Sequence, residues 1–588
     1  MKRIIDATNN IIGSYYNDTV SIVDGLEYSQ FETIKQIEYY INSRYLSGSK
    51  DSLGRDKPFF NIVNAKVNTS ITATDVDTKD INVYAENPGA FDKSFLIQRE
   101  VNEWMKENEF GITLNEMIET RAKYGGLLVK KVLENGKLRI EVPEWKNLIT
   151  DQVDIANGVV IERHYFSPSD LIKKLKAFNQ NVKAEDVMKL ASDQRQVGKD
   201  KTKTSTKYIT VYEVHGNFPK TMIDEEADEF EYSNQYHLIA GEKDQKQIVL
   251  HSAEEIESPY RYLSWRSIQG RGLGVGVVEE GFEAQMWTND AKIKEKEVVE
   301  LASRVILQTD DDKLQNNILT DLDNGSILKI QPGKQVGQLN TISGSVPQLK
   351  SIVTDWDEQY SKSESVFDTN TGNPLPANTP FRSAVLQSQN ANSLFEYRRE
   401  EFGLFIQSIF MDWIIPYITN KMNTEHILAS NYSAEELMQI DTAFATAEAN
   451  NRFTDEVLSG KVLSSADYEA MRQRYLDFIR ETKERRFLKI PEGYFKDVKT
   501  KVNVNITGEQ VNKAVVLESL NNILTLAANN PNVLQDPTLS KIFGKILEVT
   551  NAGISPLSLG IGNPKITSQA TMPQQAPQSV GIPFNPTM

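Results

Sequence analysis

The chain has 588 residues, no cysteine, five histidines and a formal net charge of −16. A chain of this length is expected to form about two to four domains. The lack of cysteine excludes disulfides, cysteine-ligated zinc, iron–sulfur clusters and thiol nucleophiles. The net negative charge argues against a protein that holds nucleic acid on a basic surface. It is compatible with a protein that lets nucleic acid slide past without binding it tightly.

The histidines and the most apolar stretch give no sign of a metal centre or a membrane span. The histidines lack the spacing of a paired-imidazole metal site, and each is expected to be structural. The apolar stretch Phe402–Ile418 is short, and it contains Gln407, Ser408 and Asp412. The apolar run near the N-terminus is too short for a signal peptide. We therefore expect no cofactor, no metal and no membrane partner.

The first half of the chain alternates between helical and extended patterns. The first 60 residues look helical and amphipathic, with apolar side chains at three- and four-residue steps from Phe31 to Ile41. Another helix is expected over Asp92–Asn108. From Gly125 onward the period changes, and Asn135-Gly136 predicts a β-hairpin. Further strands are expected at Val159–Phe166, Tyr208–Val214, Tyr236–Ile239 and Gln247–His251, which makes this region α+β with an antiparallel sheet.

Helices dominate the second half. A long charged helix is predicted from Gly276 to about Arg304, and a returning helix over Val346–Phe367. Between them lies a small β insert with strands at Val305–Thr309 and Gly325–Gln331. Prolines keep the next stretch, Thr369–Pro380, out of regular structure.

Four further segments complete the chain. The helix from about Ser383 to Tyr417 should be kinked near its end by Pro416. Another helix opens after Ser465. Residues 506–562 look like a separate helical unit, and residues 563–588 have the composition of a flexible tail.

A search for catalytic motifs finds none. The segment Gly270–Gly276 is rich in glycine but lacks the spacing of a P-loop. An anion site at the following helix is one interpretation, but we favour a hinge at which the chain turns sharply and packs closely. The acidic groups Asp310–Asp312 and Asp355–Glu358 are adjacent in sequence, which alone does not make a two-metal site. No G-x-S-x-G segment is present. We therefore expect the chain not to be an enzyme.

The order of the elements is more informative than any motif. A long α+β region is followed by a glycine hinge, a charged helix, a small β insert and a returning helix. A proline-rich loop and a long apolar helix come next. The two charged helices would be poor core elements in isolation, but they make sense when they pack against copies of themselves in a ring.

In this order of elements, across nearly the whole chain, the sequence resembles the portal proteins (head-to-tail connectors) of tailed bacteriophages. Ala122–Val129, the hairpin after it and Pro143–Ile149 resemble the family's early wing sheet. Trp265-Arg266 and Gly270–Gly272, followed by Glu279 and Asn289, are similar to its entry into the first stem helix.

Two later segments extend the resemblance. Asn324–Ile330 is similar to strands of the clip insert. Thr371-Gly372, the proline loop after it and Ser383-Ala384 resemble the tunnel loop and the helix that follows. The ordered set of segments carries the resemblance, since no one of them is as specific as a P-loop.

The resemblance implies an α+β portal fold with a wing of helices and antiparallel sheet, a helical stem, a small β-containing clip, a long helix after the tunnel loop and a short helical crown. The crown is short because only about 80 residues remain after Thr507. The divisions are then the first part of the wing (1–265), the hinge and first stem helix (266–304), the clip (305–345), the second stem helix (346–369), the tunnel loop (370–382), the second part of the wing (383–505), the crown (506–562) and the flexible tail (563–588).

Site residues follow from the same resemblance. The tunnel loop would present residues to DNA in the channel: Asn370, Thr371, Gly372, Asn373, Asn378 and Arg382. The stem would contribute Lys292, Lys294 and Lys296. The clip would dock partners through Asp310, Asp311, Asp312, Lys329 and Lys334.

The implied function is a ring of about twelve copies at one capsid vertex of the virion, assembled in the host cytoplasm. The ring would act as the channel for double-stranded DNA during packaging and ejection. Its partners would be the terminase large subunit, the neck or adaptor protein, the major capsid protein and a scaffold protein. Two alternatives stay open at this point: a nucleotide-dependent DNA motor or nuclease of the packaging machinery, and a capsid or scaffold component without a channel.

Overall fold

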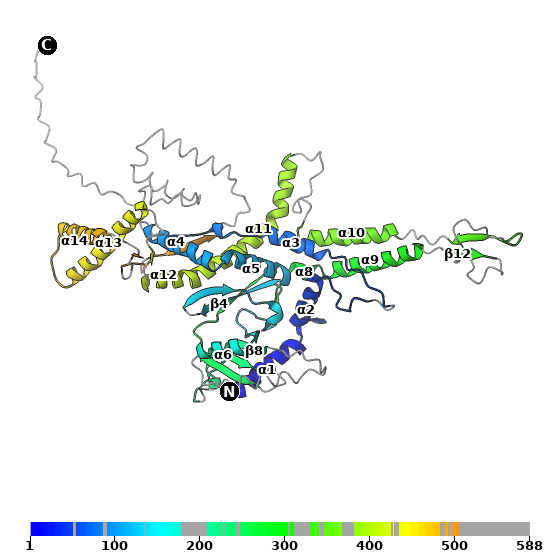
Figure 1. Ribbon diagram of the computed structural model, residues 1–588, viewed down its shortest axis with the longest axis horizontal. Helices are drawn as coiled ribbons and strands as arrows, with labels where there is room; N and C mark the ends of the chain where they lie inside the picture. The colour runs from blue at the N-terminus through cyan, green and yellow to red at the C-terminus, as the bar shows by residue number, and fades with distance from the viewer. Residues whose placement is uncertain are drawn as a thin grey trace, which may run out of the picture. The chain divides into compact units, whose positions relative to one another are not determined.

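The computed structural model describes residues 2–50, 54–85, 91–134, 136–177, 208–224, 226–228, 230–242, 247–303, 306–310, 330–339, 346–366, 381–424, 427–428, 434–481, 487–488, 490–491, 494–495 and 498–504. The chain divides into two compact units. The first comprises Met1–Asn82, Glu100–Tyr417 and Val502–Gly508, and the second comprises Val83–Arg99, Ile418–Lys501 and Glu509–Met588. The chain combines helices with antiparallel sheets, as the sequence predicts (Figure 1).

A five-stranded antiparallel sheet forms one part of the first unit. Its strand order is β10-β9-β8-β7-β6, with β6 at Leu148–Thr150, β7 at Val160–Phe166, β8 at Ile209–Pro219, β9 at Tyr232–Ala240 and β10 at Ile248–Glu254. Successive residues of a strand point to opposite faces, so Val211 packs on one face and Tyr212 on the other. Helix α6 (Pro168–Ala177) covers the first face through Leu171 and Leu175, and α1 (Lys2–Asn17) covers the second.

A smaller antiparallel sheet has the order β11-β4-β5, with β4 at Gly126–Glu134, β5 at Lys137–Glu141 and β11 at Tyr260–Ser264. Strands β4 and β5 form the hairpin that the sequence predicts, with Glu134 opposite Lys137. Gly136 has a φ of +76°, which glycine adopts without strain.

The segment before α2 departs from the prediction of a helical first 60 residues. Strands β1 (Val20–Val23) and β2 (Leu26–Tyr28) form a short hairpin around Gly25, whose φ is +85°. The predicted helix follows as α2 (Gln30–Ile41), which begins at Ser29, where the hydroxyl accepts a hydrogen bond from the Glu32 amide. Residues 42–50 and 54–60 of the segment after it are not helical.

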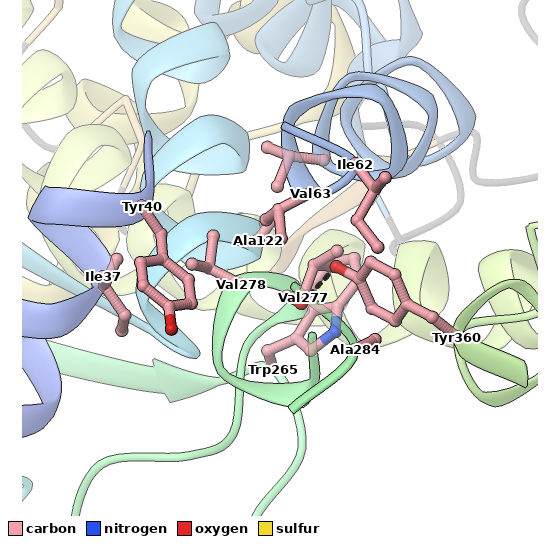
Figure 2. Packing of buried hydrophobic residues seen from close by; sticks show 11 residues of the cluster. Ile37, Tyr40, Ile62, Val63, Ala122, Trp265, Val277, Val278, Ala284 and Tyr360 are labelled. Atoms are coloured by element: carbon pink, nitrogen blue, oxygen red, sulfur yellow. Dashed lines mark hydrogen bonds between the residues drawn. The ribbon is translucent and has the colours of Figure 1, made fainter. Parts of the chain in front are cut away.

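Five helices and a tryptophan meet in the core of the first unit. The helices are α2, α3 (Val63–Ala73), α5 (Phe110–Tyr124), α8 (Val277–Glu280) and α9 (Phe282–Ser303), the last through Ala284. Val277 and Val278 lie at the centre of this cluster, with Trp265 beside them (Figure 2). Tyr360 enters from a distant part of the sequence and donates a hydrogen bond to the Val277 carbonyl at 2.6 Å.

The predicted charged helix is interrupted once. It begins as α8, breaks at Gly281 and continues as α9 (Phe282–Ser303). The returning helix is α10 (Val346–Ser363). Between α9 and α10, β12 (Ile306–Thr309) pairs with β13 (Val336–Leu339). The sequence predicts β12 but not its partner β13. The other predicted strand is Gly325–Gln331. Its residues 325–329 lie outside the described residues, and Ile330 and Gln331 are not in a strand.

The long apolar helix is α11 (Phe381–Ile409), which continues through a π-helical turn at Phe410–Ile414 into α12 (Ile415–Thr424). In this turn the Ile415 amide donates to the Phe410 carbonyl, five residues back. Ile415 follows the turn, and next comes Pro416, which has no amide proton to donate to the carbonyl four residues back. The helix extends beyond Tyr417, and the kink expected at Pro416 stays a prediction.

Among the described residues, the helical stretch Ser393–Met422 is long and apolar enough to cross a membrane by length and composition alone. Half of its most apolar window is buried inside the protein. Phe410, for example, packs edge-on against Trp104 and Phe110. A helix in the core of a protein has the same composition, and the core accounts for the buried half of this stretch.

The second unit is mainly helical. Helices α13 (Ala434–Leu458) and α14 (Ser465–Glu481) pack together through Phe453 and Tyr468, and β14 (Ile427–Leu428) pairs with β15 (Phe487–Leu488). The helix after Ser465 is the predicted one, whereas α13 is not predicted. Four elements cross the division between the units: β3 (Ile81–Ala85), α4 (Phe91–Glu107), α12 and β16 (Thr500–Val504). The predicted helical unit at 506–562 and the tail at 563–588 lie outside the described residues.

Candidate functional site

Helices α9 and α10 form an antiparallel pair, called the helical pair below (Figure 1). Near its base, the rings of Trp287 and Trp356 stack with centroids 6.3 Å apart and planes within 4°. Farther out, Glu295 and Lys350 form an ion pair at 3.9 Å. Later residues of α9 thus lie beside earlier residues of α10, so the two helices run antiparallel.

The helical pair buries little apolar surface. Among its described side chains, those of α9 that are buried are small or polar: Ala284, Gln285, Thr288, Asn289 and Ala291. Tyr360 is the only residue of α10 that is buried. Apolar side chains on both helices remain exposed, with Trp287 45% exposed: Met286, Trp287, Val299 and Ile352. Two helices that bury so little apolar surface gain little from packing, since most helical stability in proteins comes from a buried face.

The three lysines predicted on the first stem helix lie on α9, and each has an acidic neighbour on the same helix. Lys292 pairs with Glu295 at 2.9 Å, Lys294 with Asp290 at 2.6 Å and Lys296 with Glu300 at 3.6 Å. Lys292 also lies over the ring of Phe60, 5.2 Å from its centroid. The lysine charges are therefore matched locally, along the helix.

Two of the residues predicted to dock partners lie together at the end of the β12–β13 pair. The register runs from Ile306 opposite Leu339 to Thr309 opposite Val336, so Asp310 lies at the end away from the helices. The Lys334 ammonium donates to the Asp310 carbonyl at 2.5 Å. The Gln335 amide donates to the Asp310 carboxylate at 3.0 Å, and this bond lowers the pKa of Asp310. Asp311, Asp312 and Lys329 lie outside the described residues.

The glycine-rich segment forms a tight junction at the base of the helical pair. The backbones of Gly274 and Gly276 approach that of Gly125 so closely that a Cβ on any of the three would meet backbone atoms. Arg271 is bonded through two nitrogens to the Glu279 carboxylate, at 2.7 and 2.8 Å, and its guanidinium lies 4.1 Å from the centroid of the Tyr28 ring. The sharp, closely packed turn that the sequence favours is present here.

A buried ion pair joins the end of α10 to α11. Arg398 contacts Glu364 at 3.1 Å, with both side chains almost fully buried, and its guanidinium lies 4.0 Å from the centroid of the Trp265 ring. Arg121 donates to the Arg398 carbonyl at 2.7 Å and to Glu401 at 2.8 Å. The predicted tunnel loop lies between Glu364 and Arg398 in the sequence. Its residues Asn370, Thr371, Gly372, Asn373 and Asn378 lie outside the described residues; Arg382 belongs to α11, but its side chain is outside them too.

A second polar cluster lies between the five-stranded and the three-stranded sheets of the first unit. Glu162 of β7 is directly opposite Glu213 of β8. The Lys130 ammonium, from β4, donates to both carboxylates, at 2.9 and 2.7 Å. Burial alone would lower the pKa of Lys130, but the two carboxylates outweigh it and raise that pKa.

Glu162, His164 and Glu213 offer three ligand atoms within 4.8 Å of one another, which is the arrangement of a metal site. However, Lys130 contacts the Oε2 atoms of Glu162 and Glu213, which are also the oxygens that lie closest to His164. Lys130 therefore balances the charge of the two carboxylates, and we interpret the cluster as structural. Spacing along the sequence could not reveal it, since its members come from three strands; the one signal is a charged residue at a buried strand position, as at Lys130.

Two other histidines are tied into the sheet. His215 contacts Glu213 at 3.1 Å and Glu255 at 2.8 Å. Burial lowers the pKa of His215, but the two carboxylates outweigh it and leave that pKa raised. His237 lies between Ser252 and Gln235, and burial lowers its pKa to about 4.

No protein-family model matches the chain, and no curated protein matches its sequence. The functional argument therefore depends on the geometry and charges described above.

Proposed function

We propose that the chain is the subunit of a portal-type ring, which lets double-stranded DNA pass through one capsid vertex. One observation carries this proposal. The chain runs outward through α9, forms the β12–β13 pair and returns through α10. An antiparallel helical pair with a small β insert between its helices is the expected form of a portal stem with its clip. In this proposal, the α+β part of the first unit is the wing.

The surface of the helical pair supports assembly with other copies. One buried residue on an 18-residue helix is too few to hold α10 in place in a monomer. Exposed Met286, Trp287, Val299 and Ile352 become buried when neighbouring pairs pack side by side in a ring. A ring of about twelve copies is the number that the resemblance implies.

The charges of the helical pair suit a passage that does not grip DNA. Helix α9 carries five acidic and three basic residues, and α10 carries three acidic and two basic ones. The three lysines of α9 are matched by acidic neighbours. Free basic side chains in such a passage would bind phosphates with salt-dependent affinity and slow the movement of DNA.

The remaining parts take their roles from this arrangement. The β12–β13 end, with Asp310 and Lys334, docks the terminase large subunit during packaging and the neck or adaptor protein later. The wing contacts the major capsid protein and a scaffold protein. The part proposed to contact DNA is the segment 370–382, with Arg382 at its end. The protein acts in the virion, after assembly in the host cytoplasm, without catalysis of its own.

Electron microscopy of the purified full chain, viewed along its symmetry axis, tests the proposal. The expected result is a closed ring with a central hole and, in side view, a narrow stalk. Sheets, closed shells or a monomer at micromolar concentration would contradict it. ATP hydrolysis by the pure chain would instead favour a packaging motor, and the matched assay uses the same preparation without nucleotide.

A further inference from the structure

Two different surfaces lie on opposite flanks of the helical pair. On α9, Gln285 accepts a hydrogen bond from the Ile62 amide at 2.9 Å, while Glu283 lines a groove. On α10, Asp357 pairs with Lys66 at 3.3 Å, while Gln359 lines the same groove. In each helix the two residues are two positions apart, which is about 200° around the axis. The segment 55–66 therefore covers one flank, and the groove opens on the other.

The groove has a volume of about 600 Å³ and lies between the β1–β2 hairpin and the helical pair. We call it the acidic groove: Leu26, Glu27, Ile268, Glu283, Trp356 and Gln359. Leu26 is 55% exposed, so the groove has an open apolar wall. The groove arginines Arg266 and Arg271 already pair with Glu280 and Glu279. The exposed Glu27 and Glu283 leave it with an excess of negative charge.

The opposite flank has the complementary character. Residues 44–50 lie beside the segment 55–66, since the Lys57 amide donates to the Ser49 carbonyl at 2.9 Å and the Tyr45 hydroxyl to the Pro58 carbonyl at 2.5 Å. We call the surface the basic flank: Arg44, Leu46, Lys50, Lys57 and Phe60. Leu46 is 48% exposed and Phe60 49% exposed. Arg44 and Lys50 are exposed, and Lys57 lies over the Tyr45 ring, 4.6 Å from its centroid. This surface combines two apolar side chains with three cations and one exposed carboxylate, Asp56, so its charge is positive on balance.

We propose that the acidic groove of one copy receives the basic flank of a second copy. Both surfaces have apolar side chains surrounded by charge of opposite sign, which is how specific protein interfaces match. Because the surfaces differ and lie on opposite flanks, the contact is heterologous and repeats from copy to copy, so a suitable rotation closes it into a ring. The inference rests on the proposed function and names the contact surfaces of that ring.

Charge reversal in the full chain tests the pairing. Glu27→Lys with Glu283→Lys should weaken self-association at least about tenfold in sedimentation or mass photometry. Arg44→Glu with Lys50→Glu should do the same. All four substitutions together restore opposite charges across the contact and should recover assembly. The matched control, Lys106→Glu with Glu116→Lys, reverses exposed charges on α4 and α5 and should assemble like the wild type.

The lack of native cysteine permits a second measurement that does not depend on charge. Chains with Leu26→Cys and chains with Leu46→Cys are treated with a flexible bismaleimide, separately and mixed. Cross-linked dimers should form in the mixture and not in either separate sample. Equal cross-linking in the separate samples would indicate a symmetric contact and overturn the inference, as would no cross-linking in the mixture.

The outcomes separate the two proposals. If the wild type forms a ring that the groove variant forms equally well, the ring stands and this interface is wrong. If the wild type is monomeric, the ring itself is wrong. Failure of the fourfold variant to assemble, with a wild-type circular dichroism spectrum, would also overturn the pairing.

Discussion

Trp287 of α9 and Trp356 of α10 stack with their ring centroids 6.3 Å apart and their planes within 4°. Trp287 remains 45% exposed in the single chain, so one side of this stack faces solvent. The contact joins two helices that share few other buried groups. The stack therefore links the two helices of the pair. Its exposed side is a surface that we expect a neighbouring copy to cover after assembly.

Trp287→Ala should loosen α10 more than any other part of the first unit. Aromatic pairs contribute about 0.5–1.5 kcal/mol beyond the area that they bury. We expect faster hydrogen exchange in α10, with the five-stranded sheet unchanged. Trp287→Phe should retain most of the protection. Unchanged exchange in α10 after Trp287→Ala would show that the stack does not hold the pair together.

Gly281→Ala tests how α10 is attached at its base. A Cβ at Gly281 would lie 2.6 Å from Cζ of Tyr360, which is buried and bonded to the Val277 carbonyl. Such overpacking costs about 1–3 kcal/mol. We expect a lower urea midpoint and loss of protection in α10. The control is Gly111→Ala in α5, where the nearest atom would be a Thr78 methyl at 3.7 Å; here we expect no loss of stability.

The sequence predicts the elements of this fold better than their contacts. The β4–β5 hairpin, α2 and α10 follow from Asn135-Gly136 and from apolar spacing, which are local signals. The β1–β2 hairpin was not predicted, because its two strands are too short to show a period. The partner of β12 was not predicted either, since pairing depends on residues about thirty positions apart and no local pattern encodes it.

The candidate site shows the same limit. Gly281 and Tyr360 are unremarkable in the sequence, and only their approach in space makes the glycine necessary. The lysines at 292, 294 and 296 are interleaved with acidic residues, and each lies three or four residues from an acidic partner. That spacing is visible in the sequence and could have indicated matched charges.

The buried pair Glu364–Arg398 should be costly to break and easy to replace. Burial is the main cause of both pKa shifts: it raises the pKa of Glu364 and lowers that of Arg398. Burial thus outweighs the attraction between the two groups. We expect Glu364→Leu alone to destabilise the protein by about 3–5 kcal/mol, because it leaves a buried charge.

The double variant, Glu364→Leu with Arg398→Met, should recover most of that loss in urea unfolding. A double variant as unstable as the single one would show that the pair contributes more than its desolvation costs. A wild-type midpoint for Glu364→Leu alone would show that Arg398 reaches water.

Lys130 should keep divalent metals out of the Glu162–His164–Glu213 cluster. Its ammonium contacts the carboxylate oxygens that lie closest to His164. We expect micromolar Zn²⁺ to leave the melting temperature of the wild type unchanged. Lys130→Ala should be less stable, and Zn²⁺ should raise its melting temperature. Lys131→Ala changes the neighbouring residue on the opposite face of β4 and should show no Zn²⁺ effect; stabilisation of the wild type by Zn²⁺ would contradict the prediction.

His215 and His237 should give opposite pH dependences of stability. The pKa of His215 is raised in the folded chain by Glu213 and Glu255, although burial opposes them. Its stabilising contribution is present below the unfolded pKa of about 6.5 and is lost as the pH rises through the folded pKa. The pKa of His237 is lowered to about 4 by burial, so between pH 6.5 and 4 the unfolded chain binds a proton that the folded chain does not. His237 therefore destabilises the fold as the pH falls through that window.

Urea unfolding of the full chain from pH 5 to pH 8 separates the two effects. His237→Gln should reduce the loss of stability between pH 6.5 and 5, because the group that takes up the proton is gone. His215→Gln should reduce the loss above pH 6.5 and should be less stable than the wild type at pH 6, where Glu213 loses one of its partners. Identical pH slopes in the wild type and both variants would show that neither histidine changes its protonation on folding in the predicted direction.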